Sequence, residues 1–303
     1  MRMRTRVAGT IHTGGSHAVE IAYERHGDPD GRPLLLVHGL GMQLVAWHPD
    51  LLLALTRWGY DVVVCDNRDS GRSTHLTAAG RPDLRVLRAT PQAAPYSLAD
   101  MADDLAGLLD GLRWRSAHVL GVSMGGMIAQ LLALRHPRRV RSLTSVMSTT
   151  GDPDVSRPTP EAAAVLRTPP APDRAGYIEQ RVSGAAVTGS SGFAGDEQWL
   201  RTSAAAAYDR GHDPDGMLRQ LAAILTGTDR TAALADVTVP TLVVHGDADP
   251  LVPATAARAT VAAIPGAELL EIEGMGHDLP RACWERILDR LDDVIRRGEA
   301  ARR

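Results

Sequence analysis

The chain has 303 residues, of which 44% are hydrophobic and 23% are charged, and its formal net charge is −3. This much apolar sequence is sufficient for a buried core, which excludes a wholly disordered chain. Because the net charge is close to zero, the composition gives no indication of a basic surface that would bind nucleic acid or an anionic membrane.

Seven segments have the pattern of β-strands. Residues 17–25 alternate apolar and polar side chains, and we expect them to pair antiparallel with the preceding residues at an edge of the sheet. Most of the others are continuous apolar runs, which are typical of strands covered on both faces. These segments are residues 33–39, 60–66, 116–123, 140–148, 239–247 and a short last strand at 267–274.

Segments with helical periodicity lie between the strands. Ser97, with acidic residues in the turn after it, is a suitable start for one of them. Strands that alternate with helices indicate an α/β fold with a mostly parallel, doubly wound sheet. The expected helices are residues 48–57, 97–112, 124–136, 254–263 and 280–296.

Residues 150–226 interrupt this alternation. They contain no strong strand pattern but are rich in Pro, Ala and Gly, with helical patches at 196–210 and 215–227. The segment is too long for a simple connection. We therefore expect a core domain of residues 1–149 and 227–303, with residues 150–226 inserted as a helical cap over the carboxyl edge of the sheet, where ligands of open α/β sheets bind.

Gly121, Ser123 and Gly125 fit the pattern G-x-S-x-G, with a strand before it and a helix after it. In this setting a sharp turn strains the backbone of the middle residue and projects its side chain outward. Cβ atoms at the flanking positions would collide with the turn, which explains the glycines. We expect Ser123 to be a nucleophile and the Met124 N–H to donate to an oxyanion. The alternative is a glycine-rich turn with an incidental helix-capping serine.

A serine nucleophile needs a base and a carboxylate that orients the base. Among eleven histidines, His277 alone combines a strand end, a flanking glycine and a position near the C-terminus. Asp249 follows strand 239–247 where the chain has turned clear of the strand, so we expect it to orient His277. Asp247 is expected to brace that turn through backbone amides.

A second oxyanion donor is expected in the loop after strand 33–39. Gly39 and Gly41 flank Leu40 there, so the Leu40 N–H can approach the site. His38 is expected to brace this loop. In the polar segment 65–74, Asp66 and Arg68 are expected to form a buried pair that holds neighbouring loops together.

The sequence has no metal-binding pattern such as HExxH or paired Cys-x-x-Cys, and no phosphate or dinucleotide loop, so we expect neither a metal nor a cofactor. Cys65 and Cys283 are the only cysteines, and we expect both to be buried free thiols; a disulfide between them is the alternative. The opening residues lack the apolar stretch of a signal peptide, and no apolar run reaches 18 residues. A cytoplasmic protein is expected.

The motifs LLLVHGLG, DNRDSGRST, GVSMGG, HGDADPLVP and GMGHDLP occur in an order that resembles the α/β-hydrolase superfamily, over residues 17–148 and 228–296. Within it, the chain looks like the aclacinomycin methylesterase-type carboxylesterases of actinobacteria. Asp69, where the commoner form of the loop has Gly, supports this subgroup. The resemblance implies cofactor-free ester hydrolysis through an acyl-serine carried by Ser123, Asp249 and His277.

The expected substrate is a small or medium apolar carboxylic ester, with a methyl ester as one candidate. The same residues could serve a lactonase, thioesterase, C–C hydrolase or perhydrolase, or a ligand-binding sensor with a slow triad. We expect no nucleic-acid or membrane partner. A homodimer is one alternative for the oligomeric state, which the sequence leaves undecided. Candidates for lining an apolar pocket, each of which could equally belong to the core, are Met42, Trp47, Met124, Phe193, Trp199, Tyr208 and Met217.

Overall fold

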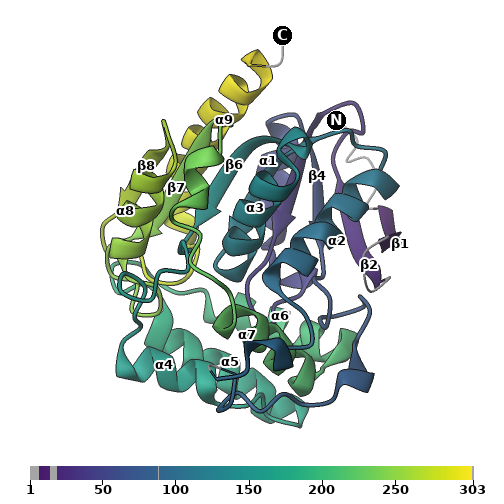
Figure 1. The fold of residues 1–303 in the computed structure, drawn as a ribbon, viewed down its shortest axis with the longest axis vertical. Helices are drawn as coiled ribbons and strands as arrows, with labels where there is room; N and C mark the ends of the chain where they lie inside the picture. Colours follow the sequence, from purple (N-terminus) through teal and green to yellow (C-terminus); the bar gives the residue numbers. More distant parts are fainter. Residues whose placement is uncertain (1–6, 14–18, 88, 302–303) are drawn as a thin grey trace.

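A computed structural model of the chain describes residues 7–13, 19–87 and 89–301. Its eight strands form one sheet in the order β1-β2-β4-β3-β5-β6-β7-β8 (Figure 1). β1 pairs antiparallel with β2, β2 pairs antiparallel with β4, and every other pairing is parallel. The strands are β1 (Val7–Thr13), β2 (Val19–His26), β3 (Arg32–Val37), β4 (Tyr60–Cys65), β5 (Ala117–Val122), β6 (Val140–Val146), β7 (Thr241–Gly246) and β8 (Glu268–Ile272).

The parallel strands are apolar throughout because helices cover both faces of the sheet. Successive residues of a strand face opposite sides, and β3 shows the result. Leu34 and Leu36 pack with α1 (Pro49–Arg57) and α9 (Trp284–Ala300), whereas Leu35 and Val37 pack with α2 (Leu98–Gly111) and α3 (Met124–Arg135). α8 (Ala254–Ala263) packs against β7 and β8.

These elements confirm the α/β fold class and the expected strands. β2 corresponds to the expected strand 17–25, of which residues 17 and 18 lie outside the described residues. Ser97 caps α2 as expected, because its hydroxyl accepts the Asp100 N–H. The expected helix 280–296 is wrong at its start: residues 281–283 form a 3-10 turn after Pro280, and α9 begins at Trp284.

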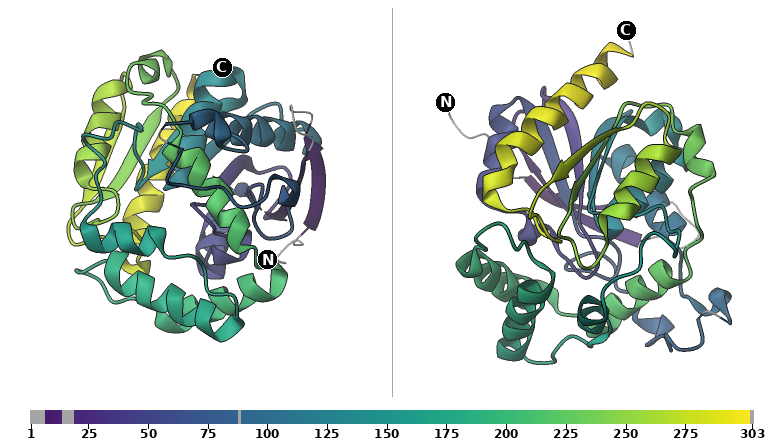
Figure 2. Two further views of the ribbon diagram at one scale, coloured as in Figure 1. Left: turned by 60° about the horizontal axis from the view of Figure 1, so that its bottom comes forward. Right: turned by 90° about the vertical axis from the view of Figure 1, so that its left-hand side faces the viewer.

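Four helices between β6 and β7 lie together across the carboxyl ends of the strands, as a layer of their own (Figures 1 and 2). We call residues 150–226 the cap. Each helix begins at a side chain that accepts a hydrogen bond from an amide of the first turn, namely Thr159, Asp173, Asp196 and Asp213. The helices are α4 (Pro160–Arg167), α5 (Arg174–Thr188), α6 (Glu197–Gly211) and α7 (Pro214–Leu225).

Buried ion pairs join the cap to the loop after β4, and they correct the expected Asp66–Arg68 pair. Asp66 instead binds Arg210 of α6 at 2.9 Å, and Arg68 binds Asp104 of α2 at 2.6 Å. Asp66 thus contacts the cap, and Arg68 contacts the helices on one face of the sheet. The loop therefore links the sheet to both the cap and these helices, whereas the expected pair would have joined only neighbouring loops.

Asp69 extends this connection. Its backbone lies in the left-handed region, with φ 63°, where glycine is favoured. Its carboxylate accepts two hydrogen bonds from Arg219 of α7, at 2.9 and 2.8 Å. This explains why an aspartate occupies a position suited to glycine: the two-pronged pair with the cap offsets the strain.

Cys65 and Cys283 are both buried free thiols, as expected. Within the described residues, the helices are all too short or too polar to cross a membrane.

Candidate active site

Ser123 occupies a sharp turn between β5 and α3, with φ 56° and ψ −120°. A Cβ at Gly121 would lie 2.1 Å from the Gly125 carbonyl oxygen, and a Cβ at Gly125 would lie 2.2 Å from the Val37 carbonyl oxygen. No larger residue fits at either position. The turn is therefore possible only with these glycines, and it presents the Ser123 hydroxyl to the cavity beneath the cap.

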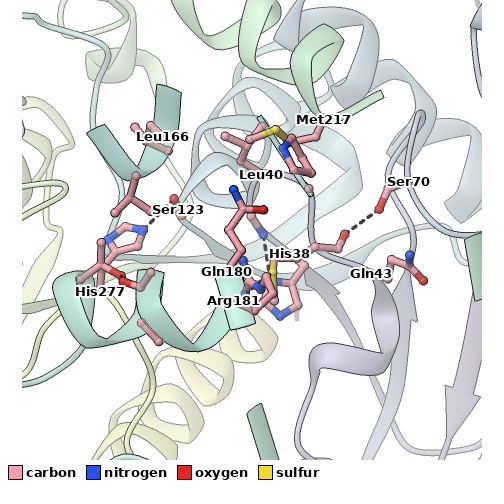
Figure 3. A pocket seen from close by; sticks show the side chains of 18 of the residues that line it. His38, Leu40, Gln43, Ser70, Ser123, Leu166, Gln180, Arg181, Met217 and His277 are labelled. Carbon is pink, nitrogen blue, oxygen red and sulfur yellow. Dashed lines mark hydrogen bonds between the residues drawn. The ribbon is translucent and has the colours of Figure 1, made fainter. Parts of the chain in front are cut away.

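Two loops at the carboxyl edge of the sheet bring His277 and Asp249 to this serine. The His277 Nε2 lies 3.0 Å from the Ser123 Oγ (Figure 3), and the His277 Nδ1 lies 2.7 Å from the Asp249 Oδ2. His277 follows β8, and its amide donates to the Thr188 carbonyl of α5 in the cap. The three side chains form a continuous hydrogen-bonded line, in which His277 can take the serine proton while Asp249 stabilises the protonated ring.

Asp249 is held as a carboxylate. Its Oδ1 accepts the amides of Leu251 and Val252 at 2.8 and 2.9 Å. Burial alone would raise the pKa of Asp249, but hydrogen bonds from His245 and His277 outweigh it and lower the pKa to about 2. The group can therefore stabilise a protonated His277. Asp247 was expected to brace its own turn, but its carboxylate instead accepts the Gly274 N–H of the loop after β8, at 2.7 Å.

His245 is a neighbour of Asp249 that sequence reasoning missed. It lies in β7 and is fully buried, and its Nε2 is 2.7 Å from the Val252 carbonyl oxygen and 3.5 Å from the Asp249 Oδ2. The available signal was the four-residue spacing between His245 and Asp249 at the end of a strand. His245 thus supports the same carboxylate oxygen that contacts His277.

The loop after β3 leaves one amide free. The Gly39 N–H donates to the His38 Nδ1, the Gly41 N–H donates to the Gln220 Oε1 of α7, and the Met42 N–H donates to the Gly39 carbonyl. Within the described part of the chain, the Leu40 N–H has no acceptor.

Met124 offers a second free amide, because it is the first residue of α3 and its N–H has no acceptor within the helix. The Leu40 and Met124 amides are thus available for a negatively charged oxygen beside Ser123. His38 braces the loop as expected through its bond to Gly39.

The cavity in front of Ser123 has a volume of about 360 Å³ and lies between the strand ends and the cap. This volume suits a small or medium ligand. Two of the sequence candidates, Met42 and Met217, line it, and so does Leu40. Apolar wall residues that the sequence did not single out are Val165, Leu166, Tyr177, Leu200, Leu251 and Met147.

None of the four aromatic candidates is among the described residues that line the cavity, which corrects the expectation for them. Trp47 is 3% exposed and packs in the core beneath the His38 ring, and Phe193 packs against the same core cluster. Trp199 contacts the ring of His48. Tyr208 lies behind the wall, stacked on His212, with its hydroxyl donating to the Pro172 carbonyl. The Met124 side chain is fully buried in the core, so it does not line the cavity.

Asp69, His75 and Asp213 form one group at the cap boundary whose possible metal-ligand atoms lie within 4.8 Å of one another. Arg219 donates to both carboxylates, at 2.8 Å in each case from its Nη2. The guanidinium already supplies the positive charge at this place, so the group acts as a link between cap and core.

Comparison with known proteins agrees with this geometry. A family model described as alpha/beta hydrolase fold matches residues 32–280. Rhodomycin D methylesterase DnrP of Streptomyces peucetius is 31% identical over 280 residues, covering 86% of this chain and 89% of that protein. DauP of Streptomyces sp. strain C5, also a rhodomycin D methylesterase, has the same identity and coverage.

Among solved structures, a hydrolase from Pseudomonas aeruginosa PA01 superposes with a TM-score of 0.67 at 27% identity, covering 93% of this chain and 97% of that one. The expected resemblance to methylesterases is confirmed.

Proposed function

The chain belongs to the α/β-hydrolase fold family, and on that premise we propose that it is a serine carboxylesterase acting on a small or medium, mainly apolar ester. The observation that carries the proposal is the line from the Ser123 Oγ through His277 to Asp249, with contacts of 3.0 and 2.7 Å. A serine hydroxyl is a weak nucleophile near neutral pH, and a base within hydrogen-bond reach activates it.

In the proposed reaction, the His277 Nε2 takes the proton of Ser123 as the Oγ attacks the ester carbonyl carbon. The carbonyl oxygen becomes an oxyanion that accepts hydrogen bonds from the Leu40 and Met124 amides, each worth about 3 kcal/mol at the transition state. His277 then gives its proton to the departing alkoxide, and the carbon–oxygen bond to the alcohol breaks. In the second half, water gives a proton to His277 and attacks the acyl carbon. The bond from that carbon to the Ser123 Oγ then breaks, His277 returns the proton to the Oγ, and the acid is released.

The cavity and the relatives support this substrate class. More of the cavity surface is apolar than polar, and its aliphatic and methionine side chains adapt to differently shaped apolar groups. The rhodomycin D methylesterases resemble this chain over most of its length, so a methyl ester of a larger apolar acid is the first substrate to test. A panel of esters, lactones and thioesters, ranked by kcat/KM, would identify the preferred bond.

The mechanism is tested with Ser123→Ala and a short p-nitrophenyl ester. We expect turnover to fall by roughly 10⁴-fold or more, with an unchanged circular dichroism spectrum. Ser183→Ala is the matched control, because Ser183 lies exposed on the outside of α5, and it should keep full activity. A folded Ser123→Ala protein with wild-type turnover would refute the proposal. Labelling of Ser123 by a fluorophosphonate without turnover of any ester would instead favour a ligand sensor.

A further inference from the structure

One positive charge at the wall of the cavity has no acidic partner. Arg181 lies on α5, is partly buried, and is the only arginine among the described residues that line the cavity (Figure 3). Its Nη2 contacts the Met42 Sδ at 2.9 Å. A thioether is an uncharged and weak acceptor, so this contact does not neutralise the guanidinium.

The acidic residues of the cavity wall are bound to other groups. Asp69 and Asp213 both accept hydrogen bonds from Arg219, and Asp213 also contacts His75. Asp278 accepts the amide and the hydroxyl of Ser190. Within the described residues, no carboxylate lies within ion-pair distance of Arg181, although 36 acidic residues occur in the sequence.

His38 adds a second donor next to this charge. Its Nδ1 accepts the Gly39 N–H, so the neutral ring carries its proton on Nε2. In the part of the chain that the structure describes, that N–H has no acceptor. Burial, reinforced by the nearby charge of Arg181, lowers the pKa of His38 to about 3. The ring thus stays neutral and remains a donor at physiological pH.

Both donors line the same cavity as the reacting serine. A Cβ at Gly39, the residue after His38, would be 3.2 Å from the Ser123 Cβ. We propose that Arg181 and His38 form a subsite for a carboxylate, and that the preferred substrate carries this acidic group in addition to its ester. The proposal rests on the proposed esterase function and narrows it from apolar esters to half-esters of dicarboxylic acids.

The test compares half-esters with neutral diesters of equal chain length. Monoethyl and diethyl succinate, glutarate and adipate are assayed by release of ethanol with the wild-type enzyme, Arg181→Met and Arg174→Met. Arg174 is the matched control, because it lies on the same helix in an exposed pair with Asp209. A hydrogen-bonded charge pair contributes a factor of roughly ten to one hundred. We expect Arg181→Met to raise KM by that factor for the preferred half-ester, with a smaller change in kcat, and to leave diesters unaffected.

Two results would overturn the subsite: a wild-type preference for diesters at every chain length, or a half-ester preference that survives in Arg181→Met. The failure of the esterase function itself gives a different result, namely no Ser123-dependent hydrolysis of any ester, including neutral p-nitrophenyl acetate.

A binding measurement keeps the subsite testable without turnover. The Ser123→Ala variant and the double variant Ser123→Ala/Arg181→Met are each titrated with glutarate and adipate by calorimetry. We expect binding that weakens at least tenfold in the double variant, and equal binding in the two proteins would refute the subsite.

Discussion

The Nε2 of His277 lies 3.0 Å from the Oγ of Ser123, although 154 positions separate the two residues in the chain. The parallel strands produce this contact, because β5 and β8 both end at the same edge of the sheet, with β6 and β7 between them. The loop after β7 supplies Asp249 to the far side of the same histidine. The site therefore depends on the sheet topology as much as on the three side chains.

Asp249→Asn should lower kcat by roughly 10³- to 10⁴-fold, because an amide that donates to the His277 Nδ1 stabilises the wrong tautomer of the base. Asp247→Asn is the control two residues away. It keeps an oxygen that can accept the Gly274 N–H, so its kcat should stay within about threefold of wild type. Steady-state kinetics with a p-nitrophenyl ester measures both. Equal losses in the two variants would contradict the role of Asp249.

Gln220 is predicted to position the oxyanion loop from the cap. Its side chain is fully buried, accepts the Gly41 N–H at 2.8 Å and donates to the Arg68 carbonyl at 2.7 Å. Gln220→Met keeps the volume but removes both bonds, so the amide of Leu40, next to Gly41, should lose its fixed direction.

We expect kcat of Gln220→Met to fall by roughly tenfold, with KM nearly unchanged, since the interaction acts on the transition state. Gln198→Met, at an exposed position of α6, serves as the control. A tenfold rise in KM with normal kcat would show that Gln220 shapes the substrate pocket instead.

Arg219→Met should strongly destabilise the protein. The guanidinium is 1% exposed and binds both Asp69 and Asp213. Its removal leaves Asp69 buried without its partner, which costs about 3–5 kcal/mol and lowers Tm by roughly 6–20 °C at about 2–4 °C per kcal/mol for chains somewhat shorter than this one.

Arg174→Met provides the comparison, because it breaks an exposed pair that water screens and that therefore contributes little to stability. Thermal unfolding followed by circular dichroism measures both variants. Similar small shifts would show that the Arg219 pair does not hold the cap to the core.

Stability should decline in mild acid because of His118. This buried ring bonds to Ser142 and Glu299, and burial lowers its pKa to about 4, against the opposing effect of Glu299. Between pH 6.5 and about 4 the unfolded chain binds a proton at this residue and the folded chain does not, so the free energy of unfolding falls as pH falls.

The loss from His118 should reach at most about 3 kcal/mol. Urea unfolding at pH 7 and pH 4.5 measures it, and His118→Gln should show a smaller difference between the two pH values than the wild type. An identical difference in both proteins would place the acid sensitivity elsewhere.

Features of the fold that depend on local sequence could be predicted. The run from Leu34 to Val37 is apolar on both faces, so it is recognisable as a buried strand, and the glycines around Ser123 identify the turn by steric need alone. His277 and Asp249 could be predicted because each follows a strand whose position in a parallel sheet is fixed.

Features that depend on distant partners could not be predicted. The expected Asp66–Arg68 pair was wrong because the actual partners, Arg210 and Asp104, come from the cap and from α2. α5 was missed because none of its side chains is fully buried, so its sequence lacks a strong apolar stripe. Arg181, which lies on that helix, was missed with it.

The aromatic candidates show the same limit. Trp47 and Tyr208 are large aromatic residues of a kind that often lines pockets. Which side chains face the cavity and which lie behind its wall depends on how the cap packs on the core.

The most direct test of the account is to identify the residue that becomes covalently bound during the reaction. The protein is treated with a fluorophosphonate, and its intact mass, its labelled peptide and its remaining esterase activity are measured over time. We expect one label per chain on the peptide containing Ser123, loss of activity in proportion to labelling, and no label in Ser123→Ala. Full labelling of another residue in parallel with inactivation, or full labelling of Ser123 without loss of activity, would contradict the account.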